Sequence, residues 1–176
     1  METTGVVRRI DDLGRVVIPK EIRRTLGIKD GTSLEIFVEK DMIALKKHSS
    51  MNNLSHFSLV YAESIYNAIK KDIIITDRDN IIACSGKNKK LYLMQPISQF
   101  LEECINQRKN VVEVEKKNIN ITETKEELCS YTISTIIANG DSIGLIIILD
   151  AEDGIGELEI KTAQIAAQFL GKHIEE

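Results

Sequence analysis

The sequence predicts an α+β protein of two domains, on three observations. Its 176 residues, 43% apolar and 28% charged, have an ordinary globular composition and are enough for two small domains. Short β-branched runs alternate along the chain with segments of helical periodicity. Short turns join neighbouring β-branched runs, which favours hairpins and an antiparallel sheet with helices packed against it.

The first element is a pair of short strands. Val6–Ile10 and Arg15–Ile18 are β-branched runs on either side of the turn Asp11–Gly14. Pro19 suits the first position of a helix and Gly27 suits the residue that ends one. A helix of about two turns is therefore expected between them.

That short helix is predicted to be amphipathic. Ile22 and Leu26 are four residues apart and form its buried side. Lys20, Arg23 and Arg24 fall at i, i+3 and i+4 on the opposite side, which places three cations on one face.

A hairpin follows the helix. Leu34, Ile36 and Val38 alternate with a second set of side chains, as expected of a half-buried strand, and Lys40-Asp41 joins this strand to Met42–Lys46. The second set is Ser33, Glu35, Phe37 and Glu39. These roughly 47 residues are rich in Val, Ile and Leu, yet a unit of this size buries too little apolar surface to be stable alone. The sequence therefore predicts an obligate dimer whose two chains share one core.

A polar, turn-prone segment, His48–Asn53, is the predicted linker. It separates an N-terminal domain, residues 1–50, from a C-terminal domain, residues 54–176. In the second domain we expect, in order, a helix at 54–69, strands at 73–76 and 81–85, a lysine-bearing loop at 86–96, a helix at 97–107, a strand at 111–115, a polar stretch through Ser130, strands at 131–138 and 143–149, and a helix at 156–174. The apolar stripes of the first and last helices are predicted to serve as core and as subunit interface.

Charge is distributed unevenly between the domains. The net charge is −4, but residues 1–48 carry ten Lys and Arg against eight Asp and Glu, and residues 49–176 carry thirteen against nineteen. Five of the seven arginines fall within the first 24 residues. Because arginine makes bidentate contacts with phosphate and guanine, this pattern indicates an anion-binding head on an acidic body.

Other classes of site lack support in the sequence. Cys84, Cys104 and Cys129 are about 20 residues apart with no close histidine, which argues against a disulfide framework and a metal site. No apolar run approaches the ~20 residues of a membrane span, and the N-terminus lacks the apolar stretch of a signal peptide. We expect a cytoplasmic protein with reduced thiols, no metal and no membrane partner.

The run Leu13–Arg24, which reads LGRVVIPKEIRR, is preceded by Asp12 and followed by Leu26-Gly27-Ile28. It resembles the signature of the AbrB family of swapped-hairpin transcription factors, and the resemblance covers the first 47 residues. It implies an interleaved dimeric β-barrel that docks a basic face on double-stranded DNA. Carried over position by position, it implies DNA contacts by Arg8, Arg15, Arg23 and Arg24, with Lys20 and Arg9 as weaker additions. The alternative is that these cations pair with Asp11, Asp12 and Glu21 as ordinary surface charge.

Residues 54–176 are similar to a GAF domain in the order of their elements. The whole chain, including Ala138–Asp141 and Ile143-Gly144, resembles AbrB-family regulators that carry a C-terminal GAF domain. The resemblance implies a homotetrameric activator and repressor of late sporulation genes, acting at the nucleoid of the forespore. It implies no cofactor, because the pattern of cyclic-nucleotide-binding GAF domains is absent, and any ligand is unknown. Lys87, Lys89 and Lys90 either approach an anionic ligand or are solvated surface charges.

Two other functions compete with DNA binding. Some free-standing GAF domains reduce methionine sulfoxide with cysteine thiols, and Cys129, expected in a polar loop, is the one candidate for a reactive thiol. The swapped-hairpin head also occurs in antitoxins, which bind a protein partner. A folded second domain in place of a short toxin-binding tail argues against the antitoxin hypothesis.

Overall fold

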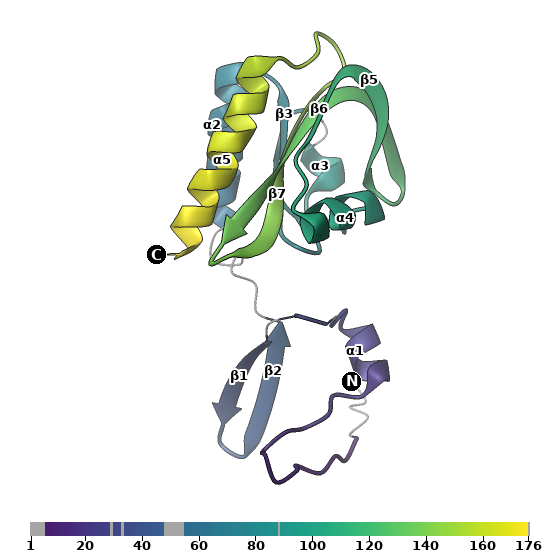
Figure 1. Cartoon of the computed structure of the whole chain (residues 1–176), viewed down its shortest axis with the longest axis vertical. Helices are drawn as coiled ribbons and strands as arrows, with labels where there is room; N and C mark the ends of the chain where they lie inside the picture. Colours follow the sequence, from purple (N-terminus) through teal and green to yellow (C-terminus); the bar gives the residue numbers. More distant parts are fainter. Residues whose placement is uncertain (1–5, 29, 33, 48–54, 88, 176) are drawn as a thin grey trace. The chain divides into compact units, whose positions relative to one another are not determined.

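The computed structural model of the chain describes residues 6–28, 30–32, 34–47, 55–87 and 89–175 (Figure 1). The chain divides into two compact units, residues 1–49 and 50–176, and each is described by itself. The predicted linker His48–Asn53 lies outside the described residues. None of the described helices has the length and apolarity needed to cross a membrane.

The described part of the N-terminal unit forms a helix and a hairpin. Helix α1 spans Lys20–Thr25. Strands β1 (Leu34–Glu39) and β2 (Met42–Lys47) pair antiparallel, with Leu34 opposite Lys47. The chain reverses at Lys40-Asp41, where Lys40 has a φ of +52°, so the predicted hairpin is confirmed.

The two strands predicted on either side of the Asp11–Gly14 turn do not form in the single chain. Val6–Ile10 and Arg15–Ile18 have no regular secondary structure. The turn itself is confirmed, because the Gly14 N–H donates to the Asp11 carbonyl (3.0 Å) and the Asp11 N–H donates to the Arg15 carbonyl (3.2 Å). β-branched residues favour extended backbone, but a strand also needs a neighbour for its hydrogen bonds, and β1 and β2 pair only with each other.

The apolar face predicted for this unit is exposed. Ile36 is 67% exposed and Val38 is 76% exposed, while Leu26, predicted to be buried, is 53% exposed. Ile22 is half-buried, and no described side chain of this unit is fully buried. In the single chain a hairpin and a six-residue helix provide no second layer to cover this face, and its burial in a core shared by two chains stays a prediction.

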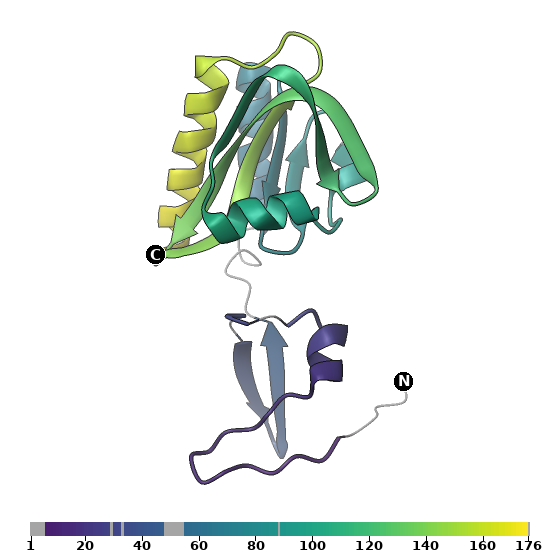
Figure 2. The ribbon, with the colours of Figure 1, turned by 45° about the vertical axis from the view of Figure 1, so that its right-hand side comes forward.

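The C-terminal unit is built on one antiparallel sheet with strand order β4-β3-β7-β6-β5. The strands are β3 (Asp72–Thr76), β4 (Ile81–Ser85), β5 (Val111–Thr122), β6 (Lys125–Ala138) and β7 (Asp141–Asp150). Helices α2 (Ser55–Ile69) and α5 (Glu157–Glu175) lie side by side on one face, and α3 (Lys89–Tyr92) and α4 (Gln99–Gln107) pack on the other (Figures 1 and 2). The predicted α+β class is confirmed.

Isoleucines on consecutive positions of the strands fill a core on each face of the sheet. Ile73 and Ile75 of β3 face α2 and α5, whereas Ile74 between them faces α3 and α4. β7 behaves in the same way, with Ile146 and Ile147 on opposite faces. Successive side chains of a strand point in opposite directions, so a strand covered on both sides reads as a continuous apolar run.

The stretch predicted to be polar and irregular before Ser130 is a long hairpin. β5 continues to Thr122 and β6 begins at Lys125. Cys129, expected in a loop, is therefore fully buried within β6. The misassignment has a physical cause: the consecutive residues Glu115–Asn118 of β5 are all polar and exposed, so the alternation of apolar and polar side chains that marks a strand is interrupted there. The loop predicted at 86–96 also contains a helix, α3, whose Tyr92 is buried in the core.

Helix α5 approaches β6 closely at Gly171. A Cβ atom at this position would lie 2.1 Å from the carbonyl oxygen of Ile137, closer than any van der Waals contact. The atom in the way belongs to the backbone, so it cannot rotate aside. Gly171 therefore permits the contact between helix and sheet on which this half of the core depends.

We expect Gly171→Ala to lower the free energy of unfolding by about 1–3 kcal/mol, the usual cost of overpacking. Helix propensity alone predicts the opposite change, because alanine stabilises a helix by about 1 kcal/mol relative to glycine. A lower free energy of unfolding would therefore reflect the steric clash. Urea denaturation followed by circular dichroism measures the change. Lys172→Ala, at an exposed neighbouring site, is the control and should stay within about 0.5 kcal/mol of wild type. A stabilised Gly171→Ala variant would contradict the close approach.

Candidate nucleic-acid interface

Helix α1 owes its position to the residues at its ends. Pro19 is the N-cap rather than the first helical residue, and its carbonyl accepts a hydrogen bond from the Arg23 N–H (2.9 Å). At the other end Gly27 takes a φ of +61°, and the Ile28 N–H donates to the Arg23 carbonyl (2.7 Å). Glycine adopts this left-handed conformation without steric cost, which is why the helix stops there.

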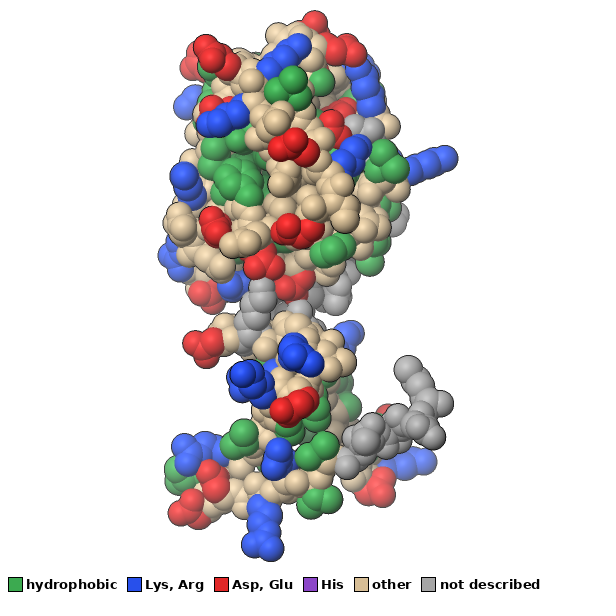
Figure 3. All heavy atoms as spheres, turned by 90° about the vertical axis from the view of Figure 1, so that its right-hand side faces the viewer, with side chains coloured by type: hydrophobic (Ala, Val, Ile, Leu, Met, Phe, Trp, Pro, Cys, Tyr) green, Lys and Arg blue, Asp and Glu red, His purple; other side chains and the backbone are tan. Residues whose placement is uncertain are grey.

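The cations of α1 are all exposed. Lys20, Arg23 and Arg24 lie at i, i+3 and i+4 of the helix, as predicted. Arg23 and Arg24 occupy the last turn, where unpaired carbonyls favour positive charge. Figure 3 shows Lys and Arg side chains standing out on the surface of the N-terminal unit.

Arg15 is held by the turn that precedes it. Its Nε donates to Oδ2 of Asp11 at 2.7 Å, while Oδ1 of the same carboxylate accepts the backbone N–H groups of Leu13 (3.0 Å) and Arg15 (2.8 Å). The hydrogen bonds from Arg15 lower the pKa of Asp11. The bond from the Arg15 backbone N–H has the largest effect, and the bond from its side chain comes next. The Arg15 side chain nevertheless remains 71% exposed.

The two remaining arginines of the predicted set, Arg8 and Arg9, precede the turn and are exposed. Within the part of the chain that the structure describes, Arg15 is the member of the set that forms an ion pair with an acid. The alternative of ordinary surface pairing thus holds for Arg15 and Asp11. The other cations, Arg8, Arg9, Lys20, Arg23 and Arg24, present their donors to solvent, and such donors suit phosphate and guanine.

Asp11 is the functional candidate that reasoning from the sequence misses. The sequence pattern indicates it only as a neutralising partner for the arginines. The signal that could have found it is an Asp followed by a glycine-containing turn and an Arg four residues later. That spacing lets one carboxylate close the turn and reach the side chain beyond it.

Two of the three lysines of the 86–96 loop form ion pairs with acids. Lys87 pairs with Glu152, and Lys89 pairs with Glu63 at 2.6 Å. Lys90 is exposed. Two of the three charges are therefore balanced within the unit, which favours the interpretation as surface charge over an anion site.

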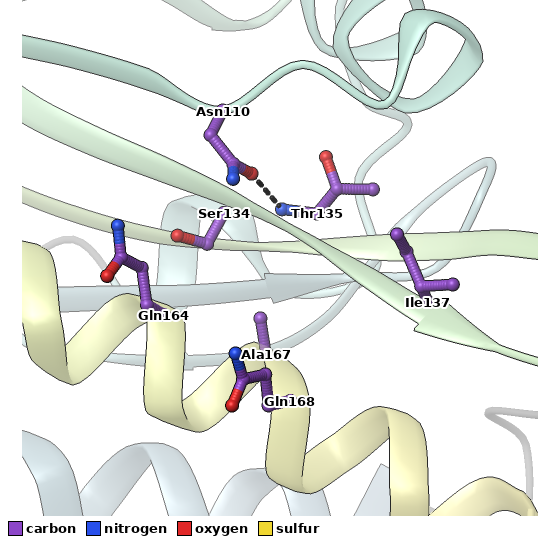
Figure 4. A pocket seen from close by; sticks show the side chains of 7 residues that line it. All are labelled: Asn110, Ser134, Thr135, Ile137, Gln164, Ala167 and Gln168. Carbon is purple, nitrogen blue, oxygen red and sulfur yellow. Dashed lines mark hydrogen bonds between the residues drawn. The ribbon is translucent and has the colours of Figure 1, made fainter.

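A shallow pocket of about 270 Å³ lies between α5 and β6, on the face of the sheet that α2 and α5 cover. Gln164 and Gln168 of α5 face Asn110 and Ser134 across it, and the Asn110 Oδ1 accepts the Thr135 N–H at 2.9 Å (Figure 4). Its lining residues, which also include Ile137 and Ala167, carry no charge. The pocket can offer hydrogen bonds to an uncharged molecule.

The three cysteines are buried in the core between the sheet and α4. Burial raises the pKa of Cys84 to about 12 and that of Cys129 to about 11, and it also raises the pKa of Cys104. The thiolate is the nucleophilic form, so these thiols are poor nucleophiles at neutral pH. Cys129 is thus not the reactive loop thiol that the enzyme hypothesis required. Among the described residues, no cluster of His, Cys, Asp and Glu is arranged to hold a metal ion.

Family models match both units. Residues 53–175 match the model described as "Stage V sporulation protein T C-terminal, transcription factor". Residues 7–52 match the model "Antidote-toxin recognition MazE, bacterial antitoxin".

Individual proteins agree with these matches. The chain is 46% identical over 178 residues to stage V sporulation protein T of Bacillus subtilis, and the match spans all of both chains. Its first part is 58% identical over 48 residues to the transition state regulatory protein AbrB of the same organism, covering 27% of this chain and 50% of that protein. A solved GAF domain from A. aeolicus, in an inactive state, has a TM-score of 0.50 and 13% identity, covering 70% of this chain and 91% of that one. This last likeness shows the fold of the C-terminal unit, a GAF fold.

The full-length identity and the match of the C-terminal model together cover both units of the molecule. The chain therefore belongs to the stage V sporulation protein T family of transcription factors.

Proposed function

We propose that this protein regulates sporulation genes by binding double-stranded DNA through Arg8, Arg15, Lys20, Arg23 and Arg24, with Arg9 as a weaker contact. The observation that carries the proposal is that these cations are exposed, within the segment that is 58% identical to AbrB. Family membership supports a role in transcription, with activation at some promoters and repression at others. The protein would act at the nucleoid in the cytoplasm of the forespore, without enzymatic activity.

The exposed apolar surface of the N-terminal unit supports an interleaved dimer. Val7 is 91% exposed and Val17 is 74% exposed, on segments whose sequence favours strands but which lack a strand neighbour. A second copy would supply both the hydrogen-bond partners and the covering layer. Each dimer would then present two copies of the cation set, and phosphate neutralisation would dominate affinity.

A second interface is proposed on the helices of the C-terminal unit. We name it the α2/α5 face, made of the exposed apolar side chains Val60, Leu158, Ile165 and Phe169. Ring contacts hold its centre, with Tyr61 and Phe169 centroids 5.3 Å apart and Phe57 and His173 centroids 4.6 Å apart. Pairing of this face with its copy would join two dimers into a tetramer.

The C-terminal unit would also sense a small molecule. The pocket between Asn110 and Gln164 offers an uncharged ligand a site on the same helix, α5, that carries the proposed interface. Because both the pocket and the proposed interface use α5, ligand binding would influence the assembly of the tetramer through this helix.

An antitoxin-like module with a protein partner is the second candidate function. The match of residues 7–52 to the MazE model favours it. Purification of the full-length protein from its own cells separates the two hypotheses, because a stoichiometric protein partner supports the antitoxin and DNA supports the regulator.

We expect Arg23→Ala to weaken DNA binding several-fold or more at physiological salt. The plot of log affinity against log salt concentration should become shallower by about one for each phosphate that the variant no longer neutralises. Fluorescence anisotropy of full-length protein on duplex DNA across a salt series measures both quantities. Arg78→Ala removes an arginine of the C-terminal unit that bonds Asn106, and it should leave binding unchanged. Normal binding by Arg23→Ala would show that the site is assigned wrongly.

We expect Ile165→Glu to convert a tetramer into dimers, because it places a charge on the α2/α5 face, one helical turn from Phe169. Ile165 is 65% exposed, so the folded unit itself should tolerate the change. Sedimentation velocity reports the mass. Leu91→Glu is the matched control, since Leu91 is 60% exposed on α3, on the opposite side of the sheet. Loss of mass in both variants, or in neither, would contradict the proposed interface.

A further inference from the structure

One carboxylate organises the turn in front of α1. Oδ1 of Asp11 accepts two backbone N–H groups, from Leu13 and Arg15, and the main chain closes the same turn with Gly14 at a φ of +77°. The second oxygen, Oδ2, accepts the Arg15 Nε–H at 2.7 Å. The two oxygens of Asp11 thus have separate roles, since Oδ1 shapes the backbone and Oδ2 holds a side chain.

The hydrogen bond to Oδ2 uses one particular donor of the guanidinium. Arginine has five N–H donors, and only the Nε–H points to Asp11. The Nη groups, which make the end-on bidentate contact with guanine or phosphate, are left for another partner. Since the side chain is 71% exposed, those groups reach solvent.

Stability does not account for this pair. Arg15 is 71% exposed and Asp11 is 37% exposed, and ion pairs between exposed groups contribute little to folding. A carboxylate on a surface that meets phosphate also repels the ligand. Asp11 therefore carries a cost for DNA affinity that it must offset in some other way.

We propose that Asp11 is a positioning residue, which fixes the Arg15 guanidinium through Nε so that its Nη groups are ready for DNA before binding. The proposal rests on the proposed function, because it assigns Arg15 to the DNA contact. A free arginine side chain must be ordered on binding, and prior ordering is worth about two- to tenfold in affinity for each side chain. The proposal requires this gain to exceed the repulsion between DNA and one exposed carboxylate, which salt screens.

The decisive comparison is between Asp11→Asn and Asp12→Asn in the full-length protein. Both variants remove one negative charge from adjacent exposed residues. The asparagine side chain of Asp11→Asn still offers an oxygen to the Leu13 and Arg15 N–H groups, so the turn is kept while the ion pair is lost. Anisotropy is measured on a duplex selected by the wild-type protein from a random pool and on an unselected duplex. We expect Asp12→Asn to bind at least as tightly as wild type and Asp11→Asn to bind the selected duplex about three- to tenfold more weakly.

Two further measurements test whether Asp11 acts through the Arg15 side chain. In an Arg15→Ala background, Asp11→Asn should cause no additional loss, since the side chain it positions is gone. In the free protein, ¹⁵N relaxation of the Arg15 Nε should show a restricted side chain in wild type and a mobile one in Asp11→Asn. This second readout needs no DNA.

The outcomes separate the inference from the function on which it rests. If both asparagine variants tighten binding equally, or the Arg15 Nε is as mobile in wild type as in Asp11→Asn, Asp11 does not position Arg15. If Arg15→Ala and Arg23→Ala both bind like wild type, the DNA site itself is wrong and the inference is overturned with it. A loss confined to Asp11→Asn, absent from Asp12→Asn and abolished by Arg15→Ala, establishes the positioning role.

Discussion

The N-terminal unit cannot cover its own apolar side chains, and much of the molecule's behaviour depends on that constraint. A six-residue helix and two six-residue strands leave Val38 76% exposed and bury no described side chain completely. Hydrophobic burial is the main source of folding stability, so such a unit gains its stability from a neighbour. Its proposed DNA contacts lie in the same segment. Folding, assembly and DNA binding are therefore expected to be linked.

The C-terminal unit, by contrast, covers most of its apolar side chains itself. Its sheet is covered on both faces, and the isoleucines of β3 and β7 alternate between two closed cores. The largely buried ion pair of Lys71 with Asp150 (2.8 Å) ties the start of β3 to the end of β7. Asp150 also accepts the N–H groups of Asp153 and Gly154, which fixes the loop that leads into α5. Apolar side chains of α2 and α5, among them Ile165 and Phe169, nevertheless stay exposed on the outer side of these helices.

The candidate site could be predicted from sequence as a set of residues but not as an arrangement. The spacing of Lys20, Arg23 and Arg24 fixes their common face once a helix is given, because helix geometry is local. The role of Asp11 was not predictable in the same way. Whether its carboxylate joins Arg15, another neighbour or solvent depends on the turn's actual dihedral angles, including the positive φ of Gly14. Composition could not distinguish a positioning contact from ordinary pairing.

The sequence by itself determined the α+β class, the turns at Gly14 and Lys40-Asp41, and the positions of the long helices. These features follow from local dihedral preferences and from periodicity over a few residues. Tertiary structure alone decided that β6 begins at Lys125, that Cys129 is buried and that Val6–Ile10 lacks a strand partner. A strand is completed by hydrogen bonds to a distant neighbour, and burial is set by what packs on top, so neither is contained in the residues of one segment.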